Sequence, residues 1–159
     1  MKVAIIAVGD LKEKYFRDAC DVYLRRLAPI SPVETLTIKE EYIADERDAA
    51  LTRKALFMEG QRIIARLNPD DEAVAMTPDG EQLDSEAFAR LIDPSASPGA
   101  KRLVFIIGGS HGLSPEVFAA CRRKLSLGLM TYPRQLARLM LIEQIYRARM
   151  IQSGRQYHK

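Results

Sequence analysis

Apolar residues along the chain form short runs that are typical of strands. Val3 to Val8 is continuously apolar, a pattern that indicates a strand covered on both faces. Val33 to Ile38 instead alternates apolar and polar positions, which predicts a less buried strand. We expect further strands at Glu72 to Thr77, at Arg102 to Ile107 and, as a short element, near Leu127 to Thr131.

Between these runs, apolar residues recur at spacings of three and four, which predicts amphipathic helices. The expected helices are Lys12 to about Leu27, Asp48 to Leu67, one capped by Asp84 or Ser85 and running to about Ile92, one beginning at Ser114, Pro115 and Glu116, and one from Pro133 to about Ile151. Pro78, Asp79 and Gly80 predict a turn. Strands alternating with helices predict an α/β fold with a mainly parallel sheet flanked by helices on both faces.

Length and composition predict a single domain over residues 1–159. With 47% hydrophobic residues the chain can build one core, and it is too short to divide comfortably into two domains. Cys20 and Cys121 have neither metal-ligand spacing nor a disulfide framework, so we expect reduced cysteines in a cytoplasmic protein without a metal. The apolar run after Met1 is too short for a signal peptide, and no stretch is long enough to span a membrane.

Basic residues gather at the C-terminal end, although the net charge is only +3. Residues 121–159 contain nine Lys and Arg and one acid, Glu143. Such a segment suits contacts with the phosphates of a nucleic acid. A solvated amphipathic helix is the commoner explanation for charge alone. Arg147, four residues after Glu143, fits an ion pair on one helix face.

Two further segments are candidates for chemistry. The glycine-rich turn Gly108 to Gly112 follows a buried strand, and ligands of open α/β sheets bind at this edge. The turn lacks the spacing of a dinucleotide fingerprint, so a plain strand-to-helix turn explains it as well. His158, beside Tyr157, could take a proton because histidine titrates near neutral pH. A frayed terminus is the alternative.

Several longer segments, taken in order, resemble the bacterial large-subunit rRNA pseudouridine methyltransferases of the SPOUT class. They are Phe105 to Pro115, Ser126 to Pro133, Leu141 to Ala148 and Gly154 to His158, with Ala7 to Tyr15, Tyr23 to Leu27 and Glu59 to Ile63 toward the N-terminus. The resemblance covers essentially the whole chain. It implies a C-terminal trefoil knot, which topology rules would not suggest, and a homodimer with each active site near the subunit interface.

The resemblance also implies a reaction, in which S-adenosylmethionine methylates N3 of a pseudouridine in the intersubunit stem-loop of 23S rRNA on assembled ribosomes. The implied cofactor contacts are Met76, Gly108, Leu127, Gly128, Leu129, Met130, Thr131 and Tyr132. As a hypothesis for the mechanism, we assign His158 as the base for the N3 proton and Tyr157 as a stacking or hydrogen-bonding partner of the target base. Arg147 either fixes the RNA or lowers the barrier to loss of the N3 proton through its charge. Another RNA substrate such as tRNA, or a non-catalytic RNA-binding protein, are the alternative functions.

The chain departs from the family pattern at three positions. Met76 replaces a common leucine, which matters little for an apolar or backbone contact. Arg134 stands where relatives usually have histidine, so a phosphate or base contact becomes the expected role there. Gln156 replaces a small residue or proline before Tyr157 and His158.

Overall fold

The computed structural model describes residues 1–155 and contains one five-stranded sheet in which all neighbouring strands are parallel. The strand order is β2-β1-β4-β3-β5. The strands are β1 (Lys2–Val8), β2 (Val33–Ile38), β3 (Asp71–Gln82), β4 (Arg102–Ile107) and β5 (Arg123–Ser126). The helices are α1 (Lys14–Leu27), α2 (Ala49–Ile64), α3 (Ser85–Leu91), α4 (Pro115–Ala120) and α5 (Arg134–Gln152), with a 3₁₀ turn at Pro94–Ala96. This arrangement confirms the predicted α/β fold.

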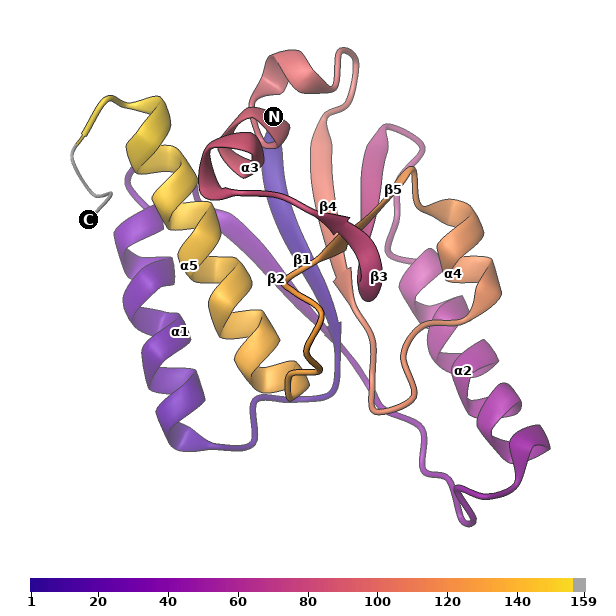
Figure 1. Ribbon diagram of the computed structural model, residues 1–159. Helices are drawn as coiled ribbons and strands as arrows, with labels where there is room; N and C mark the ends of the chain where they lie inside the picture. Colours follow the sequence, from indigo (N-terminus) through magenta and orange to yellow (C-terminus); the bar gives the residue numbers. More distant parts are fainter. Residues whose placement is uncertain (156–159) are drawn as a thin grey trace.

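Helices cover both faces of the sheet, so the molecule has three layers (Figure 1). On one face, α1, α3 and α5 bury the side of β1 that carries Val3 and Ile5. On the other face, α2 and α4 bury the side that carries Ile6 and Val8. Both faces of β1 and β4 are therefore apolar, which explains the unbroken apolar runs of these two strands.

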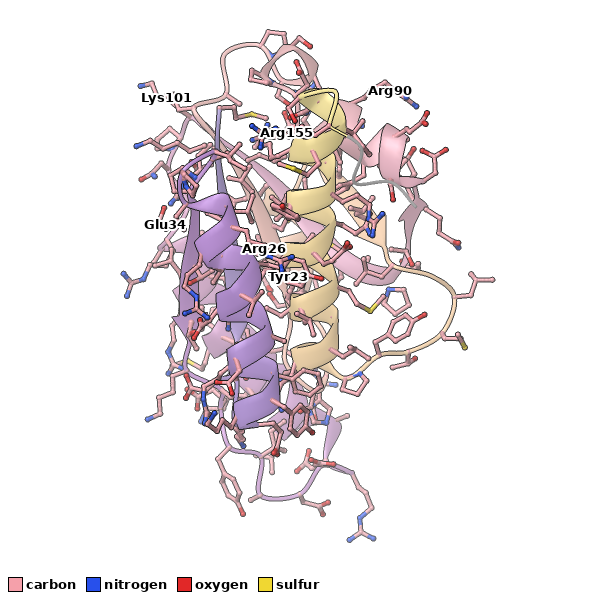
Figure 2. The ribbon with its side chains drawn as sticks, turned by 90° about the vertical axis from the view of Figure 1, so that its left-hand side faces the viewer. Tyr23, Arg26, Glu34, Arg90, Lys101 and Arg155 are labelled. Carbon is pink, nitrogen blue, oxygen red and sulfur yellow. The ribbon has the colours of Figure 1, made fainter. Side chains whose placement is uncertain are left out.

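Helices α1 and α5 pack side by side across one face of the sheet (Figure 2). The Arg26 guanidinium lies 5.5 Å from the centre of the Tyr23 ring on α1 and 5.9 Å from that of Tyr146 on α5. A cation held over two aromatic faces is attracted by both. At its other flank, α5 is tied to α3 by a hydrogen bond of 2.8 Å from the Ser85 hydroxyl to Gln144.

The predicted short strand near Leu127 to Thr131 is wrong, because the fifth strand lies earlier, at Arg123–Ser126. Val74, Ala75 and Met76 of β3 pair with residues 123–125 of β5. Gly128 then has φ +140°, which ends the extended conformation, and Leu129 is 83% exposed. Residues 127–133 thus form a loop at the carboxyl edge of the sheet.

Strand β3 is longer than predicted, and the turn expected at Pro78 to Gly80 is wrong, because the strand runs through these residues. Its pairing with β5 resumes at Glu81 after an irregularity that begins at Met76, so Pro78, Asp79 and Gly80 form a bulge within the strand. Gly80 lies against the backbone of Leu125, where a Cβ atom would meet the Leu125 Cα at 2.8 Å. The bulge therefore brings the end of β3 against β5.

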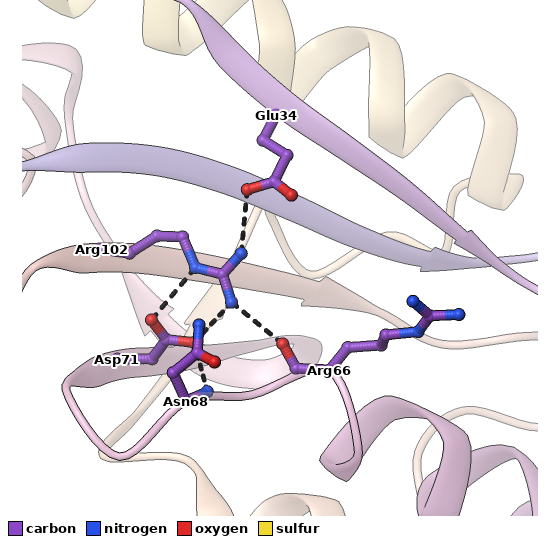
Figure 3. Close-up of polar contacts among 5 residues, drawn as sticks. All are labelled: Glu34, Arg66, Asn68, Asp71 and Arg102. Carbon is purple, nitrogen blue, oxygen red and sulfur yellow. Dashed lines mark hydrogen bonds and ion pairs between the residues drawn. The ribbon is translucent and has the colours of Figure 1, made fainter.

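At the opposite edge, a largely buried arginine side chain ties three strands together (Figure 3). Arg102 begins β4, and its guanidinium donates hydrogen bonds to the Asp71 carboxylate on β3 at 3.0 and 2.6 Å. It also contacts Glu34 of β2 at 2.9 Å and the Arg66 carbonyl oxygen at 2.9 Å. This Arg102 cluster closes the amino-terminal edge of the sheet.

The predicted helix Asp48 to Leu67 is observed at Ala49–Ile64, capped by the Asp48 carboxylate. The helix runs through Gly60, whose missing side chain leaves room for Ser114. The Ser114 hydroxyl caps α4 at the Val117 amide. Within residues 1–155, no helix is long and apolar enough to cross a bilayer. The trefoil knot stays a prediction.

Candidate active site

The glycine turn after β4 is built around close backbone contacts. Gly112 has φ +84°, and its amide donates to the Gly109 carbonyl oxygen at 3.1 Å. A Cβ atom on Gly108 would come within 2.6 Å of the Gly112 carbonyl carbon. Only glycine fits at Gly108, so the turn presents bare backbone at the carboxyl end of a buried strand, where a ligand can approach closely.

The loop after β5 folds over the same edge and is stabilised from within. The Ser126 hydroxyl donates to the Gly128 carbonyl oxygen at 2.8 Å and accepts from the Gly128 amide at 3.1 Å. The Tyr132 hydroxyl lies near Gly128, 3.6 Å from the position of a Cβ atom there. Pro133 then leads directly into α5.

Between the glycine turn and this loop lies a cavity of about 760 Å³. Its walls come from the ends of β3, β4 and β5 and from the first turn of α5. Seven of the eight expected cofactor contacts line it: Met76, Gly108, Leu127, Gly128, Met130, Thr131 and Tyr132. Leu129 does not line the cavity and points to solvent. The parallel strands thus bring three segments that are separate in the sequence to one site. Only the resemblance had predicted that these segments belong together.

The cavity also includes residues that we did not expect at the site. Thr77 and Pro78 follow Met76 at the bulge within β3, and Gln135 lies on α5. The signal for Thr77 and Pro78 was their position at the end of a predicted strand, because the carboxyl ends of parallel strands meet at one edge. Gln135 had no such signal, because it lies within the predicted helix from Pro133. Gln135 accepts a hydrogen bond of 3.1 Å from the Glu13 amide and so joins α5 to the start of α1.

Arg134 lies at the cavity wall but its guanidinium is engaged by a carboxylate rather than free for phosphate. Both of its terminal nitrogens bind Glu40, which follows β2. The hydrogen bonds from Arg134 hold the pKa of the Glu40 carboxyl below its usual value, and the pairing raises the pKa of Arg134. Nothing in the pattern around Glu40 had marked it, apart from its place directly after a strand.

A second, smaller cavity of about 310 Å³ lies behind this ion pair and is acidic. Glu40, Glu41, Glu46 and Glu59 contribute to its wall, together with His111 of the glycine turn. Burial raises the pKa of the Glu59 carboxyl, which accepts a hydrogen bond of 2.9 Å from the Glu41 amide. Among residues 1–155, no cluster of His, Cys, Asp and Glu is arranged to hold a metal ion.

Arg147 lies in the middle of α5 and does not line either cavity. Its guanidinium donates to the Glu143 carboxylate at 3.1 and 2.7 Å, which confirms the ion pair expected from their spacing. Arg147 lies thirteen positions after Arg134, which is at the cavity wall, and this is a distance of about 20 Å along the helix axis. The other two expected catalytic residues, Tyr157 and His158, lie outside the residues that the structure describes.

The fold and this site agree with a comparison of the sequence with known proteins. The family described as "Predicted SPOUT methyltransferase" matches residues 1–158. The relatives include the proteins named "Ribosomal RNA large subunit methyltransferase H" from Streptococcus thermophilus, 43% identical, and from Carboxydothermus hydrogenoformans, 42% identical, each over 100% of both chains. A protein of the same name from Lactococcus lactis is 40% identical, again over 100% of both chains.

The family match shows that the chain is a SPOUT methyltransferase. The parallel sheet with a cavity at its carboxyl edge is consistent with this class. Within that class, the chain belongs to the family of the ribosomal RNA large subunit methyltransferases H. The resemblance found from the motifs is therefore confirmed over the full length of the chain.

Proposed function

We propose that this enzyme uses S-adenosylmethionine to methylate N3 of a pseudouridine in the intersubunit stem-loop of 23S rRNA on assembled ribosomes. The observation that carries the proposal is the 760 Å³ cavity, lined by seven of the eight residues expected to bind the cofactor. Its relatives are named as methyltransferases of ribosomal RNA of the large subunit.

The cavity suits the methyl donor in its chemistry. Drug-sized ligands bind in clefts of roughly 300–1,000 Å³ with mostly apolar walls and a few placed polar groups. Met76, Leu127 and Met130 supply apolar wall, while the bare backbone at Gly108 and Gly128 lets polar groups of a ligand approach peptide amides. When bound there, S-adenosylmethionine supplies an electrophilic methyl group.

In the proposed mechanism the protein orients the reactants and removes one proton. N3 of the target base must lose its proton to become nucleophilic, and we assign this step to the imidazole of His158. Tyr157 stacks on the splayed base or hydrogen bonds to it. Arg147, whose guanidinium Glu143 orients, contributes a contact to the RNA.

The geometry of α5 favours a homodimer in which the tail of one subunit serves the cavity of the other. Helix α5 begins at the cavity with Arg134 and carries the chain about 28 Å away by its end at Gln152. Six further residues lead to His158 and span at most about 20 Å when extended. The backbone of the tail is therefore too short to bring His158 back to the start of α5 in its own chain, which supports a tail donated by the other subunit.

Transfer of a tritium-labelled methyl group tests the reaction. We expect labelling of assembled ribosomes, with the label on N3 of one pseudouridine of 23S rRNA, and none of tRNA. Labelling of tRNA instead would identify a SPOUT enzyme with another substrate. Calorimetry with S-adenosylmethionine adds a second readout, because a non-catalytic RNA-binding protein would bind RNA in a salt-sensitive way without affinity for the cofactor.

Mixed dimers test the assignment of the tail. His158→Ala and Gly108→Val should each inactivate the homodimer, the first through the base and the second through the Gly112 contact. Random mixing of the two inactive variants should restore about a quarter of the wild-type activity, since half of the dimers are mixed and each has one intact site. No restored activity would show that tail and cavity belong to one subunit.

A further inference from the structure

Arg134 joins four segments of the chain that are distant in the sequence. It begins α5, and it binds Glu40 after β2, with 2.6 Å between its Nη2 and the Glu40 Oε2. Its Nη1 donates to the Ser110 hydroxyl of the glycine turn at 3.2 Å. The same hydroxyl donates to the Glu40 carboxylate at 3.1 Å, which closes a triangle of polar groups.

The fourth segment is the end of β1, where the backbone makes room for the guanidinium. Gly9 has φ +83°, and a Cβ atom there would lie 2.9 Å from the Arg134 Cζ. Gly109 likewise lies against the pair, since its Cβ atom would be 3.6 Å from the Glu40 Oε1. Any side chain at Gly9 would displace the guanidinium, so the ion pair is part of the packed carboxyl edge rather than a loose surface contact.

The pair is partly sheltered from water, and its two members line different cavities. The side chains of Arg134 and Glu40 are 21% and 29% exposed. Arg134 and Ser110 line the large cavity, while Glu40 and Ser110 line the acidic one. A two-pronged arginine–carboxylate contact fixes both distance and orientation, which a lysine with one point charge does not do.

We propose that Arg134 is a positioning residue of the methyltransferase, which acts with Glu40 to hold the glycine turn in the shape that receives the methyl donor. The inference rests on the proposed function for the identity of the donor. Because Glu40 neutralises the charge of the Arg134 guanidinium, Arg134 does not serve as a phosphate contact. It acts through Ser110 on the turn Gly108 to Gly112.

The test compares Arg134→Lys and Glu40→Gln with a matched control, Arg62→Ala. Arg62 pairs with Glu41, the neighbour of Glu40, but lines neither cavity. Three quantities are measured for each variant: the Kd of S-adenosylmethionine by calorimetry, the Kd of ribosomal RNA by filter binding, and hydrogen exchange of the turn amides without cofactor.

Both Arg134→Lys and Glu40→Gln should raise the cofactor Kd about tenfold and speed exchange at the turn by a similar factor, because the two-pronged contact is lost. The Kd of RNA should change less than about twofold, since charge-paired arginine adds little to phosphate binding. The double variant should be no worse than either single variant, because one interaction is removed in all three. Arg62→Ala should behave as the wild type.

Unchanged cofactor affinity and turn exchange in both variants would overturn the proposal. So would a weakened RNA complex with an unchanged cofactor Kd, which would make Arg134 an RNA contact. If the wild-type protein bound no S-adenosylmethionine, the proposed function would fail, while exchange at the turn would still decide whether Arg134 and Glu40 hold it. If hydrogen exchange sped up equally at the turn and in the rest of the protein, and the variants also lost thermal stability, the pair would have only a general structural role.

Discussion

Arg102 is the single side chain on which the amino-terminal edge of the sheet depends most. Its partner Asp71 is 3% exposed, so removal of the guanidinium leaves a carboxylate in a nearly dry site (Figure 3). We expect Arg102→Ala to lower the free energy of unfolding by about 3 kcal/mol, since breaking a buried ion pair costs that much. Urea unfolding measures this directly.

The control for this variant is its neighbour Lys101, which pairs with Asp70 in an exposed setting. Lys101→Ala should change the free energy of unfolding by less than about 1 kcal/mol, because solvent weakens such pairs. Equal losses for the two variants would mean that burial does not set the strength of the Arg102 cluster.

The same cluster predicts a dependence of stability on pH. Burial alone would raise the pKa of Asp71, but hydrogen bonds from Arg102 and from the Asn68 amide together lower it below its usual value. A carboxyl with a lowered folded-state pKa contributes stability above its unfolded-state pKa and loses it as pH falls through the folded-state value. Wild-type stability should therefore drop as acid is added below about pH 4.

Asp71→Asn removes this titration, so the difference in unfolding free energy between variant and wild type should shrink as the pH falls. Urea titrations between about pH 3 and pH 7 would measure it. A difference that stays constant over that interval would assign the acid sensitivity to other carboxylates.

The packing of α2 against α4 depends on a glycine in a helix. Alanine favours helices by roughly 1 kcal/mol over glycine, so Gly60→Ala should stabilise an isolated α2. In the protein its methyl group would strike the Ser114 side chain, with 3.3 Å to Cβ and a closer contact to the hydroxyl. We expect a net loss of about 1–2 kcal/mol in unfolding free energy, because overpacking outweighs propensity.

A second substitution separates the two effects. In a Ser114→Gly background the contact is gone, so Gly60→Ala should become neutral or stabilising when unfolding free energies are compared. A penalty of the same size in both backgrounds would rule out the Ser114 contact as its cause.

At the scale of the whole molecule, the exposed loop beside the cavity is the expected contact surface of the proposed homodimer. Leu129 and Met130 are 83% and 70% exposed, although both are large and apolar. In the proposed homodimer, the tail of a second subunit reaches the cavity next to this loop. We expect Leu129→Asp to weaken the proposed dimer and to reduce methyl transfer with it, which light scattering coupled to gel filtration and the tritium assay would measure.

The matched control is Tyr42→Asp, because Tyr42 is 89% exposed but lies beside the acidic cavity. It should leave the molar mass in solution unchanged. A dimer that persists in Leu129→Asp would move the interface away from this loop.

Hydrophobic patterns predicted most of the elements, because strands and helices differ in the spacing at which apolar residues recur along the sequence. The runs at Val33–Ile38 and Arg102–Ile107 became strands with those bounds. The fifth strand was misplaced because Arg123 and Lys124 do not look like strand residues. Their extended conformation comes from pairing with β3, an interaction between distant residues.

The site divides in the same way. Its glycine turn and the segment from Leu127 to Tyr132 could be recognised locally, and the order of motifs gave the class of reaction. The pairing of Arg134 with Glu40 could not be recognised from the sequence, because the two residues lie 94 positions apart. They meet only because parallel strands end at the same edge of the sheet. The sequence by itself determined an α/β methyltransferase of the SPOUT class and its elements, since periodicity and motifs are local. Tertiary structure decided the strand order, the cavity walls and the partners of buried charges, because these depend on which distant segments pack against one another.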